Sequence, residues 1–336
     1  FQMTEDKTEV IGGTDAPSAT GSGNTFNVSG TAKIQKAINA AFTGETINVA
    51  AGTYTEQLLI QKSINLVGAG IDETIVKAPA GRVATAPAFS AGENFQADYI
   101  LAAYPTTVLT DPDTISVKVT GFTFDADEQL MVNGGRYPGV FFRKVFNSTI
   151  GDAGLFDSKV MGFNSSDTET SGIWVEHTCK LTIHGNTFSN FTEFGANIYG
   201  YSGYTNPIVT TSNNTFNGAS GFSSILYWYT DTGIIHDNTI IGGINGISIT
   251  EASNNTITKN TISGIQSGDT SSPEASGWAI GFEGASSIHN TIGDGTLTNA
   301  NDITTSDLGI YLTVADGNTA EGNKIYSNTN GVYNAD

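Results

Sequence analysis

The stretch that decides the fold is Gly246-Ile247-Ser248-Ile249, which is followed by Ile257-Thr258-Lys259-Asn260-Thr261-Ile262. The same pattern opens at Gly172 and leads to Ile183-His184-Gly185-Asn186-Thr187-Phe188. It opens again at Gly309 and leads to Ala320-Glu321-Gly322-Asn323-Lys324-Ile325. In all three copies the asparagine stands 14 residues after the glycine. A fixed offset between a short apolar strand and an asparagine indicates an internal structural repeat.

Four further segments follow the pattern with small changes. Ser224 leads to Asn238 at the same offset, Gly277 leads to Asn290 after 13 residues, and Gly195 leads to Asn214 after 19. The segment 139–142 fits if an alanine takes the place of the asparagine. The repeat therefore extends over most of the second half of the chain.

Apolar and polar residues alternate with a period of two in each copy, which is typical of short strands. A strand of about four residues cannot bury its apolar side alone, so successive coils must stack, about 4.8 Å apart. The recurrent asparagines then lie over one another and can pair their amides along the axis. The fold class predicted is all-β, a right-handed, single-stranded parallel β-helix. An immunoglobulin-like sandwich is the alternative, but it does not explain an asparagine column.

The N-terminal part carries a resemblance to known proteins. Residues 31–41, 46–56 and 64–70 resemble the opening of the right-handed parallel β-helix superfamily, which includes pectate lyases, pectin methylesterases and NosD-type repeat proteins. The downstream copies resemble the NosD-type repeat. This resemblance implies the fold and leaves the function open, because one superfamily hosts many activities. Independently, Ile34, Ala37, Ile38 and Ala41 form one apolar face, which predicts a short helix that caps the N-terminal end.

These observations predict two parts. Residues 1–30 are expected to be a tag remnant and an N-terminal extension, because Phe1-Gln2-Met3 resembles the residues that remain after a cleavable expression tag is removed. Residues 31–336 are expected to form the β-helix. A new coil starts at Gly331, so we expect further chain, another domain or self-association at the C-terminal end.

Composition excludes several classes of function. The chain has 14 Lys plus Arg against 33 Asp plus Glu, a net charge of −19, which disfavours nucleic acid and anionic membranes as partners. No apolar run is long enough to insert into a membrane. Cys179 is the single cysteine, so an internal disulfide is excluded. An acidic, Thr/Asn/Gly-rich chain of this kind suggests an exported protein, extracellular or at the cell surface, whose signal peptide has been removed.

The repeat also predicts which side chains point outward from one sheet. Counting from each corner glycine or serine, the second residues are Phe141, Trp174, Asn197, Leu226, Ser248, Ala279 and Tyr311. The fourth residues are Arg143, Glu176, Tyr199, Trp228, Thr250, Gly281 and Thr313. Tyr201, Tyr229 and Asp231 belong to the loops just beyond. Several large aromatic residues on neighbouring coils are unusual for a solvated face.

Two interpretations of this aromatic face stay open. Aromatic rings stack on sugar rings, so the face could be a polysaccharide groove lined by Phe141, Trp174, Asn197, Tyr199, Tyr201, Trp228, Tyr229 and Glu251. Alternatively, long loops cover the same rings, as they would any packed side chain.

Candidates for catalysis lie on the same face. Arg143, Lys144 or His177 could abstract a proton beside a uronate carboxylate, which is lyase chemistry. Glu176, Asp231 and Glu251 could instead act as the carboxylate pair of a glycoside hydrolase. The segment 174–177 resembles the Trp-Ile-Asp-His of pectate lyases, but their calcium and arginine motifs are missing. For each candidate, an ordinary surface or ladder residue is the alternative that the pattern favours.

No cofactor is required by any motif in the sequence. Asp125, Asp127 and Glu128 follow a predicted strand and could hold Ca²⁺ through oxygen ligands, although turn chemistry explains them as well. The sequence thus predicts an exported, carbohydrate-active β-helix protein that binds and could cleave a polysaccharide as a lyase or hydrolase. A non-catalytic surface, adhesion or envelope module is the alternative.

Overall fold

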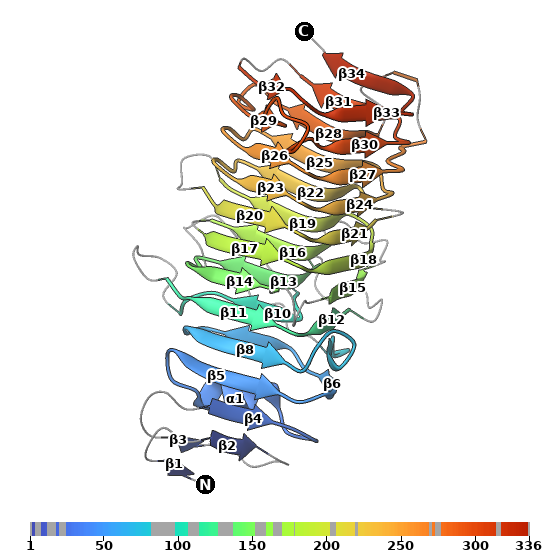
Figure 1. Ribbon diagram of the computed structural model, residues 1–336. Helices are drawn as coiled ribbons and strands as arrows, with labels where there is room; N and C mark the ends of the chain where they lie inside the picture. The colour runs from blue at the N-terminus through green and yellow to red at the C-terminus, as the bar shows by residue number, and fades with distance from the viewer. Residues whose placement is uncertain are drawn as a thin grey trace.

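The computed structural model describes residues 2–3, 8–11, 18–19, 25–81, 98–106, 114–126, 137–151, 159–163, 170–177, 179–201, 206–218, 221–268, 271–272, 277–313 and 317–334. Within these residues the chain winds into stacked coils, and each complete coil adds one strand to each of three parallel sheets. The blue-to-red progression of Figure 1 follows the chain from one end of the stack to the other. The predicted parallel β-helix is thereby confirmed.

We number the three sheets by the order in which the chain reaches them. Sheet 1 contains β2 (Thr8–Ile11), β4 (Thr25–Val28), β5 (Glu45–Val49), β8 (Ile64–Gly68), β11 (Val117–Thr120), β14 (Ser148–Ile150), β17 (Lys180–His184), β20 (Ile208–Ser212), β23 (Ile234–His236), β26 (Thr256–Thr258), β29 (Thr291–Ile292) and β32 (Thr319–Ala320).

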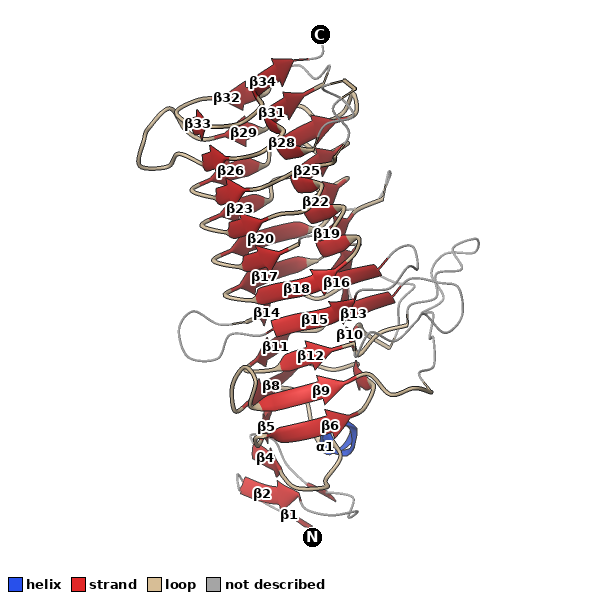
Figure 2. Cartoon of the chain, turned by 90° about the vertical axis from the view of Figure 1, so that its right-hand side faces the viewer, coloured by secondary structure: helices blue, strands red, loops and turns tan. Residues whose placement is uncertain are grey.

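Sheet 2 contains β6 (Gly52–Thr55), β9 (Thr74–Lys77), β12 (Thr123–Asp125), β15 (Lys159–Phe163), β18 (Thr187–Phe191), β21 (Thr215–Asn217), β24 (Thr239–Ile241), β27 (Thr261–Ser263), β30 (Asp302–Thr304) and β33 (Lys324–Tyr326). Sheet 3 contains β7 (Leu58–Ile60), β10 (Leu101–Ala103), β13 (Tyr137–Arg143), β16 (Thr170–Glu176), β19 (Phe194–Tyr199), β22 (Ser223–Trp228), β25 (Asn245–Thr250), β28 (Trp278–Glu283), β31 (Leu308–Leu312) and β34 (Asn330–Asn334). In Figure 2 sheet 3 follows the right-hand edge of the stack.

The apolar residues of the repeat form one continuous core inside the coils. Ile173, Ile225 and Ile247 are fully buried, and they occupy equivalent positions on their strands. Phe188 and Phe216 stack across neighbouring coils with ring centroids 4.5 Å apart and planes 2° from parallel. Because each strand lies over its counterpart, apolar residues pack on apolar residues from one coil to the next.

The asparagines form the expected ladder at the bend between sheets 1 and 2. In each step the side-chain oxygen of one asparagine accepts hydrogen bonds from the backbone N–H and the side-chain NH₂ of the asparagine one coil before it. The ladder runs through Asn186, Asn214, Asn238, Asn260, Asn301 and Asn323. Each donating side chain also bonds a backbone carbonyl, so the side-chain NH₂ groups of these buried amides are satisfied.

The structure corrects one member of this ladder. Asn290 belongs to a second ladder, between Asn255 and Asn318, at a different corner. Asn301 takes the place predicted for Asn290 in the first ladder. The extra residues between β29 and β30 delay the return of the chain to this corner, which a fixed spacing could not predict.

The N-terminal helix is confirmed as α1 (Ile34–Ala40), and its inward face is buried. The Glu56 carboxylate accepts hydrogen bonds from the backbone N–H groups of Ile34 (2.9 Å) and Gln35 (3.1 Å), which satisfies two first-turn donors that lack a partner within the helix. The cap is partial, however. Sheet 3 ends at β7, whereas sheet 1 continues through β4 to β2. The parallel ladder therefore includes strands before residue 31, where we expected it to begin.

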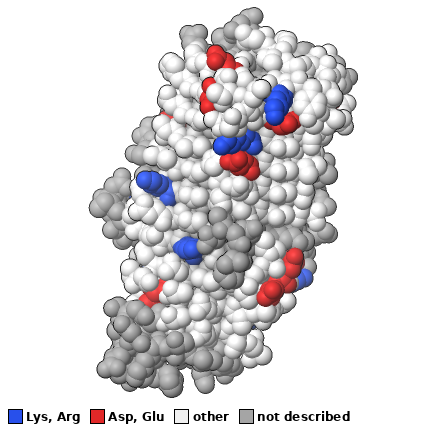
Figure 3. All heavy atoms as spheres, viewed as in Figure 1, with Lys and Arg blue, Asp and Glu red and all other residues white. Residues whose placement is uncertain are grey.

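Two short strands, β1 (Gln2–Met3) and β3 (Ser18–Ala19), pair with each other apart from the three sheets. In the described part of the chain, no helix has the length and apolarity needed to cross a membrane. Acidic and basic side chains are scattered over the face shown in Figure 3, without a patch of one sign.

Candidate functional site

Sheet 3 positions the predicted site residues on its outer side. The register places Arg143, Glu176, Tyr199, Trp228 and Thr250 directly over one another on successive coils. The residue after each of these strands turns the chain away from the sheet. Lys144, His177, Tyr229 and Glu251 all do so with left-handed backbone, with φ between 48° and 56°.

The column continues differently from the prediction beyond Thr250. Its next member is Glu283, and Gly281 lies beside Ser248 in the neighbouring column. The expected positions of Ala279 and Gly281 were therefore wrong by two residues. The count from Gly277 misplaces them because Ile280, and not Trp278, is the inward partner of Ile247. Glu283 is consequently a residue of this face that the sequence analysis missed.

The part of the face nearest the N-terminus is covered. Phe141 and Trp174 point away from the solenoid core and form a separate apolar cluster with Tyr99, Ala102 and Tyr104. The rings of Tyr104 and Phe141 meet edge to face at 6.4 Å. Phe141 is 0% exposed and Trp174 is 3% exposed, so neither offers a face to a polymer. For these two residues the covered interpretation is correct and the open-groove prediction is wrong.

Arg143 and Glu176 form a buried ion pair. Nη1 of Arg143 donates to Oε1 of Glu176 at 2.8 Å, and the two side chains are 1% and 0% exposed. The Tyr201 hydroxyl donates to the other carboxylate oxygen of Glu176 at 3.1 Å. These groups were predicted to act at an open surface, and they lie beneath it instead.

His177 completes the same network. Its Nε2 lies 2.8 Å from Nη2 of Arg143. A guanidinium is always protonated, so Nε2 accepts this hydrogen bond and the ring is neutral. Burial, followed by the charges of Arg143 and Lys144, lowers the pKa of His177 to about 3. The ring of His177 stacks on Tyr201 with centroids 4.5 Å apart. The network thus fixes the position of Tyr201.

Next to this network lies a group of half-buried aromatic residues, which we call the aromatic surface: Tyr199, Tyr201, Trp228 and Tyr229. Tyr199 contacts Tyr201 at 4.9 Å and Trp228 at 5.2 Å, and Trp228 contacts Tyr229 at 6.3 Å, between ring centroids. The four residues come from two neighbouring coils, those of β19 and β22. These four rings lie next to one another on the outer side of sheet 3.

Oδ1 of Asn197, which is 2% exposed, and Nε1 of Trp228 have no hydrogen-bond partner among the described residues. Asn197 lies between Trp174 and Leu226 in the register of sheet 3. Buried polar atoms usually find a partner in folded proteins, so these two are exceptions.

Asp231 and Glu251 border the aromatic surface and bind backbone groups of the next coils. Asp231 accepts from the N–H of Ser253 at 2.8 Å and from the side chain of Asn206 at 3.1 Å. Glu251 accepts from the N–H of Ser286 at 3.1 Å. Both carboxylates remain half-buried. Their hydrogen-bond partners therefore differ from those of Arg143 and Glu176, with which they were grouped as catalytic candidates.

The predicted calcium site is only partly within the described residues. Asp125 lies 3.6 Å from Nζ of Lys77, in an ion pair. Asp127 and Glu128 lie outside the described residues. No cluster of three or more His, Cys, Asp or Glu side chains suited to a metal occurs in the described ranges.

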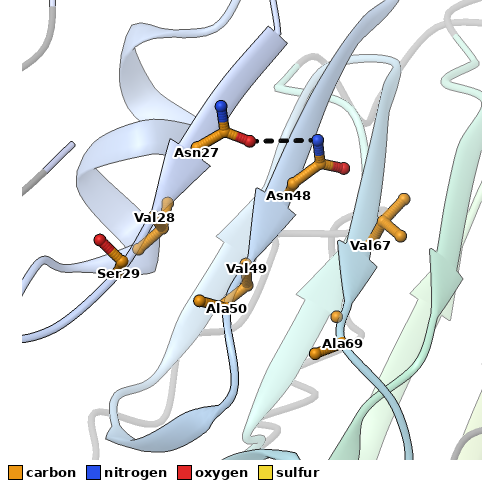
Figure 4. A pocket seen from close by; sticks show the side chains of 9 residues that line it. Asn27, Val28, Ser29, Asn48, Val49, Ala50, Val67 and Ala69 are labelled. Carbon is orange, nitrogen blue, oxygen red and sulfur yellow. Dashed lines mark hydrogen bonds between the residues drawn. The ribbon is translucent and has the colours of Figure 1, made fainter. Parts of the chain in front are cut away.

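A separate hollow of about 350 Å³ lies at the N-terminal end. It is lined by β4, β5, β8 and the turns that follow them, and Figure 4 shows Asn27 and Asn48 hydrogen-bonded at its rim. It contains none of the predicted site residues.

Comparison with solved structures returned matches at low identity. An alginate lyase from Paenibacillus sp. is 13% identical, with a TM-score of 0.49, over 84% of this chain and 95% of that chain. A family 28 exopolygalacturonase from Yersinia enterocolitica is 11% identical, with a TM-score of 0.48, over 89% of this chain and 74% of that chain. A search of curated proteins gave no match.

One family model matches, and it is described as "Periplasmic copper-binding protein (NosD)". The described residues do not fit a copper centre. Copper prefers imidazole and sulfur ligands, but Nε2 of His177 is held by Arg143 and Nδ1 of His184 lies 2.8 Å from Oγ of Ser212. Cys179 is buried, its pKa is raised to about 12 by burial, and its thiol donates to the Glu176 carbonyl.

The match to the family model covers residues 127–336, which is more than half of the chain. This region contains β13 to β34, including the aromatic surface and the whole asparagine ladder. The chain therefore belongs to the NosD family of parallel β-helix proteins.

Proposed function

We propose that this protein is exported and binds a polysaccharide along the aromatic surface. The observation that carries the proposal is the contiguous set of Tyr199, Tyr201, Trp228 and Tyr229, half-buried on two neighbouring coils. Sugar rings present apolar C–H faces that pack on aromatic rings, while phenol and indole groups keep a polar end for hydroxyls. The periplasmic description of the family supports export.

The buried network suits binding better than cleavage. Arg143, Glu176 and His177 are already engaged with one another, and a histidine with a pKa of about 3 is a weak base near neutral pH. Their contacts hold Tyr201 against Tyr199. A surface whose rings are fixed before binding loses less entropy when a ligand arrives. These residues are therefore positioning residues in the proposal.

Cleavage of the bound chain is the second candidate function, and Glu283 is the observation that favours it. Burial raises the pKa of its carboxyl, which prepares it to donate a proton. It lies in the same column as Trp228, two coils further along. Asp231, which accepts two hydrogen bonds, is the second carboxyl group that would complement it.

Binding to a panel of insoluble polysaccharides tests the proposal. We expect retention of the wild-type protein on at least one of them, and a loss of about 30-fold or more in Trp228→Ala, the magnitude of a hot-spot residue. Tyr326→Ala is the matched control, because Tyr326 is an exposed aromatic residue of β33 on sheet 2. Equal retention of both variants would place binding elsewhere, and no retention of the wild-type protein would refute the proposed function.

The same mixtures test the second candidate. New reducing ends that disappear in Glu283→Gln would indicate hydrolysis assisted by Glu283. Unsaturated uronate ends would instead indicate a lyase and would contradict the role given to this carboxyl. Retention without either product leaves binding as the function.

A further inference from the structure

We infer that the polysaccharide bound by the aromatic surface is uncharged, an inference that rests on the proposed function and narrows its ligand class. It follows from where the charges of sheet 3 lie relative to the aromatic surface. An acidic polysaccharide needs accessible cations along its path, and an amine-bearing one needs accessible anions that lack partners.

The guanidinium on the covered side is not offered to a ligand. The guanidinium of Arg143 is 1% exposed and its charge is compensated by Glu176 at 2.8 Å. Breaking this pair to bind a uronate would leave Glu176 buried without its counter-ion, which is strongly unfavourable. The net charge of −19 adds long-range repulsion for any polyanion.

The opposite border of the aromatic surface is acidic. Glu251 occupies the turn position that Tyr229 occupies one coil before it, and Glu283 follows Trp228 and Thr250 in the same column. Asp231 lies three residues after Trp228. A polyanion laid across the rings would meet these carboxyl groups on the side of the aromatic surface that faces the C-terminal coils.

These carboxyl groups are nevertheless poor sites for a cationic sugar. Asp231 and Glu251 already accept hydrogen bonds from the backbone N–H groups of Ser253 and Ser286. Glu283 has a raised pKa, so it favours the neutral form more than an exposed carboxyl does. The border therefore repels anions, while the carboxylates of Asp231 and Glu251 are already engaged by hydrogen bonds within the protein.

The polar atoms within the surface are neutral as well. Oδ1 of Asn197 accepts and Nε1 of Trp228 donates, and neither has a partner among the described residues. Together with the phenols of the tyrosines, they match the donor and acceptor character of sugar hydroxyls.

Soluble oligosaccharides of matched length test the inference by calorimetric titration. The probes are β-linked glucose and N-acetylglucosamine oligomers, oligogalacturonate and oligoglucosamine. We expect an uncharged oligomer to bind at least tenfold more tightly than either charged one, with less than a twofold change between low and high salt. Tighter binding of oligogalacturonate or oligoglucosamine, weakened by salt, would overturn the inference and leave the proposed function intact.

A double variant tests whether the acidic border causes the weak binding of oligogalacturonate. A gain in binding cannot result from a loss of the fold. Glu251→Gln/Glu283→Gln should bind oligogalacturonate more tightly than the wild type, by at least about threefold, while Tyr326→Ala should not change it. If removing both carboxyl groups leaves the discrimination against oligogalacturonate unchanged, the acidic border is not its cause. Failure of every probe, together with failure of retention on the insoluble panel, would refute the proposed function itself.

Discussion

Replacing Asn238 by alanine tests the asparagine ladder as the device that holds successive coils in register. Asn238 is 1% exposed, and its side chain makes four hydrogen bonds. Its NH₂ donates to the Thr211 carbonyl (2.8 Å) and to Oδ1 of Asn260 (2.9 Å). Its Oδ1 accepts from the backbone N–H and the side-chain NH₂ of Asn214, both at 3.0 Å.

The magnitude follows from these bonds. Alanine leaves the buried N–H of Asn214 without its acceptor, which costs about 1–3 kcal/mol, and each other lost bond costs about 1 kcal/mol. We expect the local free energy of opening to fall by at least about 4 kcal/mol, which is close to a thousandfold or more in the opening equilibrium. Because each coil of a solenoid contacts mainly its neighbours, the effect should stay within the adjacent coils.

Native-state hydrogen exchange measures this directly, since the amide of Asn214 is itself the reporter. Peptides that span β20 to β27 should lose protection, while those from β5 and β8 should not. Asn217→Ala, which replaces an exposed asparagine of β21, should change protection by less than about 0.5 kcal/mol. The reasoning is refuted if the two variants lose the same protection.

Three further predictions concern buried groups. Cys179, whose thiol has a pKa of about 12, should not react with a thiol reagent at pH 8 until the protein unfolds; prompt reaction would contradict its burial. His177 should show no titration by NMR between pH 8 and pH 5. Because its folded pKa of about 3 lies below the unfolded value, its contribution to stability is present above pH 6.5 and is lost as the pH falls towards 3. The substitution His177→Gln should remove this part of the pH dependence, and an unchanged acid limb would contradict it. Gly151→Ala should lower the melting temperature much more than Gly30→Ala. Both have positive φ, but a Cβ at Gly151 would lie 1.8 Å from the His184 carbonyl oxygen and one at Gly30 would meet nothing within 4 Å; similar melting temperatures would exclude the close approach.

Much of the architecture could be predicted because residues that are close together in the sequence define each repeat. The spacing of Gly246, Ile247 and Asn260 determines a strand, a core position and a ladder position at once. The helix at 34–40 could be predicted from its apolar face alone. The remaining details could not be predicted because the loops differ in length. Asn301 takes the ladder position expected for Asn290, since the sequence does not show where the chain runs between β29 and β30.

The sequence could predict which site residues lie over one another, but not which of them other side chains cover. Equivalent corners place Tyr199 over Glu176 and Trp228 over Tyr199, as the register of the repeat requires. Whether such residues are open depends on what packs across them, and no periodicity reports that Tyr104 covers Phe141. The hydrogen bond from Tyr201 to Glu176 likewise joins a loop of one coil to a strand of another.

The central claim is that a polysaccharide lies against the aromatic surface, and fluorescence of Trp228 tests it most directly. A Trp174→Phe/Trp278→Phe variant keeps Trp228 as the only tryptophan, since the chain has three. Titration with a polysaccharide that retains the protein should shift its emission to the blue, with the same midpoint as calorimetry, because the indole loses contact with water. Saturable binding without any change in the emission of Trp228 would show that the ligand lies on another face.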